Sequence, residues 1–216
     1  MKENRDFYFT VEGETEKLYL QWLQKTINVC ESSLYRVSFK CKVEKNPSKY
    51  AKSLTVRSRS KVTVTHVFDY EGPQHDQEFR NMVKLVKMAD KLKNGLAYKV
   101  GYNNLTFEVW LLLHKRSFVK PVIRQQEYLK LINETFNQSF EDMKAYKRVD
   151  NFGRLLENLT LDDVKQAVLY ANRIMKRLKE NAIEPQSAEG FCYYKENPSL
   201  SFHEQIEIIL RTCGLV

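Results

Sequence analysis

The chain has 216 residues, of which 43% are hydrophobic and 12% aromatic, so it can bury a core of its own. Its 35 Lys and Arg residues exceed its 27 Asp and Glu residues, and the formal charge of +8 favours a partner that carries phosphate groups, such as DNA or RNA. The low Gly and Pro content excludes a low-complexity chain, and no apolar run is long enough to span a membrane.

Residues 1–6 are charged and lack the apolar segment of a signal peptide. The cysteines Cys30, Cys41, Cys192 and Cys213 are scattered and form no CxxC pair, which argues against a zinc knuckle and against a disulfide framework. We therefore expect a reduced, cytoplasmic protein.

Strand-like and helix-like segments alternate over the first 114 residues. Short apolar and β-branched runs predict strands at 7–11, 35–43, 62–68 and 96–100, with a turn at 101–104. Apolar residues at helical spacing predict a helix capped by Thr15 and further helices from 47 to about 59, through 79–92 and over 107–114. This alternation is typical of an α/β fold with a mostly parallel sheet and helices on both faces.

From residue 122 onward the pattern is helical. The clearest apolar stripe covers residues 161–178, and a last helix begins at Ser201, where Glu204 completes a capping-box pattern. No repeat or long linker separates this part from the rest. We expect a metal-binding core over residues 1–120 and a helical C-terminal region over 121–216, packed together as one compact unit.

Acidic residues follow two of the predicted strands. Glu12 leaves the first strand and Glu16 lies in the first turn of the next helix, whereas Asp69 and Glu71 follow the third strand. Ligands of parallel sheets collect beyond the carboxyl ends of the strands, and clustered carboxylates are the hard oxygen ligands that Mg²⁺ prefers. Each carboxylate alone is explained as well by a turn or a helix cap. The joint pattern predicts a metal site for chemistry on phosphate.

The same residues carry a resemblance to known families. The string VEGETE at 11–16, followed by FDYE at 68–71, resembles the Toprim signature of a Glu after the first strand and a DxD-like pair after a later one. The segment NLTFEVWLLLH at 104–114 is more closely similar to the NPxFExWLLLH segment of RloB-like proteins, and residues 197–199 resemble the C-terminal motif of that family. The resemblance extends over nearly the whole chain.

The resemblance implies a Toprim-like Rossmannoid core and a role in bacterial anti-phage defence of the abortive-infection type. Related nucleases of the overcoming-lysogenization-defect type cleave nucleic acid with Mg²⁺ or Mn²⁺, and RloB-like proteins are often encoded beside an ABC-type ATPase. Glu12 would match the Toprim glutamate, Glu16 the acidic residue four positions later, and Asp69 with Glu71 the DxD pair. Two positions depart from the patterns, because Glu71 replaces the second Asp and Leu105 replaces the usual Pro.

Four further residues are candidates for the site. Glu108 begins the predicted helix at 107–114 and could complete the metal site, with a cap or an ion pair as the equal alternative. His114 could carry a proton or contact phosphate, although a histidine with internal hydrogen bonds at a helix end is the better expectation. Lys147 and Arg148 could neutralise charge on a phosphate, and the alternative is a solvated basic surface.

Three functions fit these observations. The first is a metal-dependent nuclease that works with an ATPase subunit. The second is a non-catalytic regulatory subunit that binds metal and nucleic acid, whose amphipathic helices after residue 122 could serve an interface, including one that forms a homo-oligomer. The third and weakest is strand joining or primer synthesis, because no tyrosine stands out as a topoisomerase nucleophile.

Overall fold

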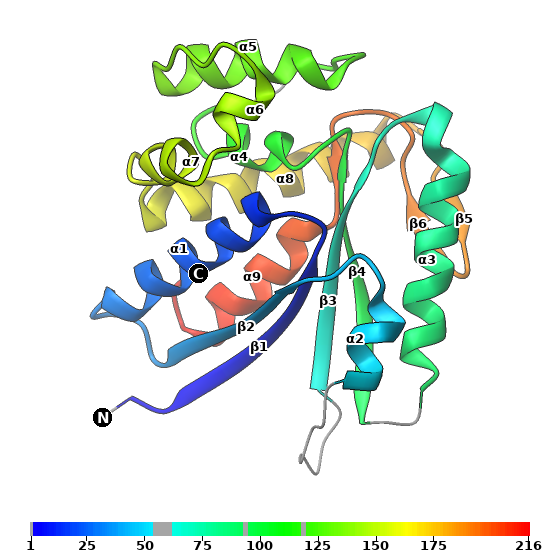
Figure 1. Cartoon of the computed structure of the whole chain (residues 1–216), viewed down its shortest axis with the longest axis horizontal. Helices are drawn as coiled ribbons and strands as arrows, with labels where there is room; N and C mark the ends of the chain where they lie inside the picture. Colours follow the sequence, from blue (N-terminus) through cyan, green and yellow to red (C-terminus); the bar gives the residue numbers. More distant parts are fainter. Residues whose placement is uncertain (1, 54–61, 93–94, 118–119) are drawn as a thin grey trace.

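The computed structural model describes residues 2–53, 62–92, 95–117 and 120–216. A five-stranded sheet in the order β2-β1-β3-β4-β7 forms its centre (Figure 1). The first four strands in the chain are parallel, and β7 pairs with β4 in the antiparallel direction. The strands of this sheet are β1 (Asn4–Val11), β2 (Arg36–Val43), β3 (Val62–Tyr70), β4 (Leu96–Asn104) and β7 (Ser199–Leu200).

Helices cover both faces of this sheet (Figure 1). α1 and α9 pack on one face together with the other helices of the C-terminal half, and α2 and α3 pack on the opposite face. The helices are α1 (Glu14–Val29), α2 (Pro47–Ser53), the 3-10 turn η1 (Pro73–His75), α3 (Asp76–Asp90), α4 (Glu108–Leu113), α5 (Gln125–Phe136), α6 (Met143–Tyr146), α7 (Val149–Leu156), α8 (Leu161–Glu180) and α9 (Phe202–Thr212). The predicted α/β class, with a mostly parallel sheet, helices on both faces and a mainly helical C-terminal part, is confirmed.

Two apolar clusters flank the sheet. On the α1 side, Val67 of β3 belongs to a cluster that also contains residues of α1, α4, α5, α7, α8 and α9. On the opposite side, Phe68 packs with Phe79 of α3, and their ring centroids lie 5.1 Å apart. Because consecutive residues of a strand point to opposite faces, a strand covered on both sides needs apolar residues at neighbouring positions.

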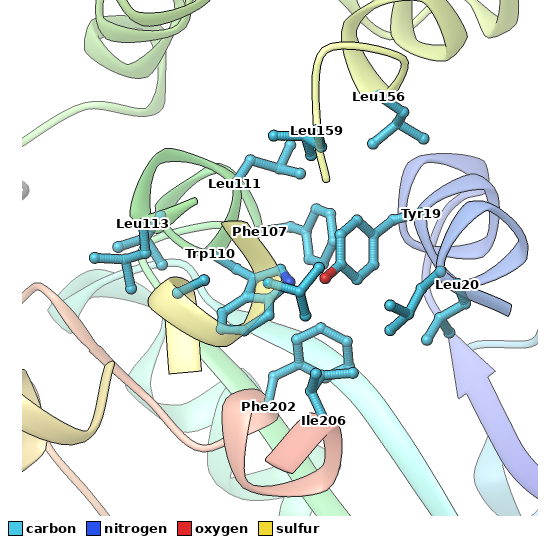
Figure 2. Close-up of a cluster of buried hydrophobic side chains, with 14 of the residues drawn as sticks. Tyr19, Leu20, Phe107, Trp110, Leu111, Leu113, Leu156, Leu159, Phe202 and Ile206 are labelled. Carbon is cyan, nitrogen blue, oxygen red and sulfur yellow. The ribbon is translucent and has the colours of Figure 1, made fainter. Parts of the chain in front are cut away.

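α4 is the most deeply buried helix of the site region. Figure 2 shows Trp110 of α4 facing Tyr19 of α1 and Phe202 of α9. The Trp110 side chain is fully buried, and its ring centroid lies 6.2 Å from that of Tyr19 and 5.7 Å from that of Phe202. This packing fixes the position of Glu108, the first residue of the helix.

Several local predictions were wrong. Residues 101–104, predicted as a turn, continue β4, because β3 and β7 pair with them on either side. Thr15 is not a helix cap, since α1 begins after Gly13. Ser201 precedes α9 but makes no side-chain cap bond, because its Oγ atom accepts from the Tyr102 backbone N–H and donates to the Val100 carbonyl.

The C-terminal half also contains strands where only helices were predicted. β5 (Gln186–Ala188) and β6 (Phe191–Tyr193) form a hairpin that packs against α3. The Tyr193 hydroxyl donates to Asp76 Oδ1 of α3 at 2.7 Å and ties the hairpin down. The predicted helix from residue 47 is present over Pro47–Ser53, and its predicted remainder lies outside the described residues. Across the described helices, we find none with the length and apolar character that crossing a membrane requires.

Candidate functional site

Four acidic residues from separate segments meet at one edge of the sheet. Glu12 follows β1, Glu16 lies in the first turn of α1, Asp69 lies near the end of β3, and Glu108 begins α4. The carboxyl ends of β1 and β3 are neighbours, because these two strands pair in parallel. This edge also receives the N-terminal ends of α1 and α4, which favour negative charge.

Glu16 is held against the start of α1. Its side chain turns back over Gly13, so that a Cβ atom on Gly13 would come within 3.0 Å of Glu16 Oε2. The residue is only 7% exposed, and burial, followed by the nearby Glu108 carboxylate, raises its pKa to about 7. Glu16 can therefore hold or release a proton near neutral pH.

Asp69 and Glu12 lie in the same electrostatic environment. Burial raises the pKa of Asp69 well above its ordinary value, and the carboxylates of Glu16, Glu108 and Glu12 add to this effect. The Asp69 Oδ1 atom is buried and finds no hydrogen-bond partner among the described residues. Burial also raises the pKa of Glu12, against the opposing effects of a hydrogen bond from the Asp69 backbone and of the Lys45 ammonium.

Glu108 and Lys147 form an ion pair beside these carboxylates. Glu108 is fully buried, and its Oε2 atom accepts a hydrogen bond from Thr106 Oγ1. Its Oε1 atom lies 3.6 Å from the Nζ atom of Lys147, whose side chain is about half exposed. Burial alone would lower the pKa of Lys147, but Glu108, Asp69 and Glu16 together raise it. Lys147 is therefore a cation that can reach both the carboxylates and solvent.

Glu71 and Arg148 lie farther out. Glu71 follows the end of β3, its side chain is half exposed, and its Oε2 atom lies 4.0 Å from His75 Nδ1. It nevertheless lines a cleft of about 220 Å³ together with Glu12 and Asp69. Arg148 is exposed at the start of α7. The structure thus brings together Glu12, Glu16, Asp69, Glu108 and Lys147, and it places Glu71 at the rim.

His114 is a structural residue, so its predicted contact with phosphate has no support in this geometry. It is buried, its Nδ1–H donates to the Trp110 carbonyl at 3.0 Å, and its Nε2 lies 3.1 Å from the Tyr19 hydroxyl. Both ring nitrogens are therefore occupied inside the protein. Burial lowers the pKa of His114 to about 4, so the ring is neutral at physiological pH.

This neutral, buried state predicts a pH dependence of stability. The unfolded imidazole binds a proton near pH 6.5, but the folded one does so only near pH 4, so the contribution of His114 is complete above pH 6.5 and is lost as the pH falls to 4. Urea denaturation measures the free energy of unfolding of wild type and of His114→Gln. The difference between them, in favour of wild type, should therefore fall by about 3 kcal/mol from pH 6.5 to pH 4. A difference in unfolding free energy that stays constant over this pH range would contradict the assignment of His114 as a neutral, buried structural residue.

The oxygen atoms of this site suit a hard divalent cation that is held by few protein ligands and completes its coordination with water. Across residues 2–53, 62–92, 95–117 and 120–216, no three Asp, Glu, His or Cys side chains stand close enough together to hold one ion. Mg²⁺ commonly binds through one or two carboxylates and keeps several waters for its substrate. Burial and neighbouring carboxylates raise the pKa values of Glu16 and Asp69, and one Asp69 oxygen finds no partner among the described residues, which matches this kind of site.

Comparison with known proteins places the chain in a family. The family described as RloB-like protein matches residues 7–209. The chain belongs to the RloB-like family. No curated protein and no solved structure matches it. The predicted RloB-like resemblance is thus confirmed.

Two tyrosines near the site of this RloB-like protein were missed as functional candidates. Tyr128 of α5 and Tyr146 of α6 are buried, and their hydroxyls have no hydrogen-bond partner among the described residues. Burial raises the pKa of both hydroxyls, and the nearby carboxylates raise it further, Glu108 and Asp69 for Tyr128 and Glu108 for Tyr146. In a sequence, tyrosines at helical spacing are predicted to be core residues. Only the structure, which places them beside acidic residues, indicates a functional role.

Proposed function

We propose that this RloB-like protein hydrolyses phosphodiester bonds in DNA or RNA with Mg²⁺ or Mn²⁺ bound among the carboxylates of Glu12, Glu16, Asp69 and Glu108, of which one or two would contact the ion directly. One observation carries the proposal. These four acidic side chains come from separate segments and meet in a partly buried site, where burial and the neighbouring carboxylates raise the pKa values of Glu16 and Asp69. A protein retains such an arrangement when a cation offsets the repulsion.

The residues of the site have separate tasks in this proposal. The bound cation would polarise the phosphate and lower the pKa of an attacking water. Glu16, which a bound cation would keep ionised, can accept the proton of that water. Lys147 can turn from Glu108 toward the substrate and neutralise charge that develops on the phosphate oxygens.

The wider role belongs to the same proposal. A glutamate after β1 and an aspartate at the end of the adjacent β3 support a relation to Toprim proteins. From the family resemblance we infer a role in anti-phage defence in the cytoplasm, with an ABC-type ATPase as partner. The formal charge of +8 agrees with a nucleic acid substrate.

The experiment is an incubation of the purified protein with single- and double-stranded DNA, tRNA and other RNA, in Mg²⁺, in Mn²⁺ and in EDTA. We expect cleavage that needs the metal and that falls at least about a hundredfold in Glu12→Ala and in Asp69→Ala. Glu157→Ala, which removes an exposed carboxylate at the C-terminal end of α7, outside the acidic cluster, serves as the control. Cleavage that persists in both site variants would refute the proposal.

A non-catalytic regulatory subunit is the second candidate. Glu108 is fully buried and Glu16 nearly so, so a substrate reaches them only if the edge of the sheet opens. Metal-dependent binding of nucleic acid without turnover, or turnover that appears only when an ATPase partner is added, would favour this function over the first.

Gly13→Ala tests whether the position of Glu16 matters. A methyl group at residue 13 would approach Glu16 Oε2 to 3.0 Å and push the carboxylate away from the start of α1. The backbone of Gly13 is extended, with φ −138°, so alanine fits there without backbone strain. We expect unchanged stability in EDTA and Mn²⁺ affinity that is weaker by roughly fivefold to tenfold, measured by calorimetry. Unchanged affinity would remove Glu16 from the metal site.

A further inference from the structure

Asn103 is a buried side chain that finds no hydrogen-bond partner among the described residues. It is 0% exposed, and both its Oδ1 and Nδ2 atoms lack a partner in the part of the chain that the structure describes. Buried amides in native proteins are nearly always paired, because an unpaired one keeps its full desolvation penalty. The next residue differs, since Asn104 Nδ2 donates to the carbonyls of Tyr194, Lys195 and Glu196.

Asn103 faces the acidic site. It stands beside Asp69 in the parallel pairing of β4 with β3, so the two side chains leave the same face of the sheet. A Cβ atom on Gly101, two positions earlier on β4, would contact Phe202 of α9, which identifies this face as the α1 and α9 side. Glu16 and Glu108 lie on that side as well.

Three oxygens without a hydrogen-bond partner among the described residues are therefore buried in one region. They are Asp69 Oδ1, Asn103 Oδ1 and Glu108 Oε1. Glu108 Oε1 also faces the Lys147 ammonium, whose Nζ atom lies 3.6 Å away. All three are hard oxygen donors, as Mg²⁺ and Mn²⁺ require. When both carboxylates are ionised, they and the neutral amide carry a charge of −2, which a divalent cation balances once Lys147 turns from Glu108 toward solvent or substrate.

We propose that Asn103 is a ligand of the cation and that Asp69, Asn103 and Glu108 form its inner binding site, with Glu12 and Glu71 on the substrate side. The inference rests on the proposed function for the presence of a cation, and it assigns the ligands. It also explains why a set of three acidic, histidine or cysteine ligands is not found among the described residues, since the third ligand is an asparagine.

The first test is the binding of Mn²⁺ alone, followed by electron paramagnetic resonance and calorimetry. Wild type should bind Mn²⁺, and Asn103→Leu, which has a similar volume but no ligand oxygen, should bind it at least about tenfold more weakly. Asn103→Asp restores an oxygen and should bind as tightly as wild type or more tightly. Glu157→Gln, which removes an exposed carboxylate at the end of α7, should change the affinity by about twofold or less.

The second test is thermal unfolding in EDTA, which does not depend on activity. Asn103→Leu removes two unpaired polar atoms and should raise Tm by about 2–4 °C, whereas Asn104→Leu removes real hydrogen bonds and should lower it.

Equal Mn²⁺ affinity in wild type and Asn103→Leu, no Mn²⁺ binding to wild type, or a lower Tm for Asn103→Leu would each overturn the proposal. If Mn²⁺ binds as expected but no nucleic acid is cleaved, the ligand assignment stands and the nuclease activity falls. If wild type cleaves nucleic acid but Asn103→Leu binds Mn²⁺ as tightly as wild type, the nuclease activity stands and the ligand assignment falls.

Discussion

Asparagine in place of Asp69 is expected to stabilise the cation-free protein and to abolish its stabilisation by Mg²⁺. The Asp69 carboxylate is surrounded by Glu16, Glu108 and Glu12, and burial together with their charge raises its pKa well above the ordinary value. A raised pKa means that the ionised carboxylate destabilises the folded protein at neutral pH. Asparagine keeps the shape and removes the charge.

In EDTA we expect Asp69→Asn to gain on the order of 1–3 kcal/mol in its free energy of unfolding. Wild type should recover stability as Mg²⁺ is added, by about 2.7 kcal/mol when the free ion reaches a hundred times its dissociation constant, whereas the variant should not. Urea denaturation in EDTA and in Mg²⁺ measures both effects. Glu157→Gln is the matched control. A variant that is less stable than wild type in EDTA and responds equally to Mg²⁺ would show that Asp69 is not a ligand.

Trp110→Ala should cause the largest loss of stability among single substitutions near the site. The side chain is fully buried in α4 and packs against rings from α1 and α9 (Figure 2). Truncating a buried tryptophan typically costs about 3–5 kcal/mol, out of a total stability of about 5–15 kcal/mol. Glu108 should then lose its fixed position as α4 loosens.

The other tryptophan provides the control. Trp22 lies on α1 and is only partly buried, so Trp22→Ala should lose roughly half as much stability or less. Denaturation followed by circular dichroism measures both variants, because the removed fluorophore makes fluorescence unsuitable for comparison. A loss for Trp110→Ala no greater than that for Trp22→Ala would show that α4 is not the anchor of this region.

The acidic part of the site was predictable from the sequence because acidic residues stand at the points where the apolar runs of predicted strands end. Apolar runs stop at Glu12 and at Asp69, and parallel strands bring such stops to one edge of a sheet. Glu108 was placed correctly at the start of a helix by the apolar run that follows it. The exposure of Glu71 was not predictable, because the strand ends before it and its backbone no longer alternates.

The remaining part of the site depends on contacts that sequence patterns do not encode. Gly101, Asn103 and Asn104 have the composition of a turn, yet pairing with β3 and β7 keeps them in a strand and directs Asn103 toward Asp69. Tyr128 and Tyr146 occupy apolar positions of helices, and only the packing of α5 and α6 near Glu108 gives their hydroxyls a polar environment. Ser201 has the spacing of a capping box, but its hydroxyl binds the backbone of β4 instead.

The most direct measurement of the central claim is the anomalous diffraction of a crystal soaked in Mn²⁺. A cation shared by acidic residues at the edge of the sheet predicts a strong peak next to Asp69, within ligand distance of Glu108 or Glu12. Crystals that show no peak there at millimolar Mn²⁺, or a peak only at other surface carboxylates, would contradict it.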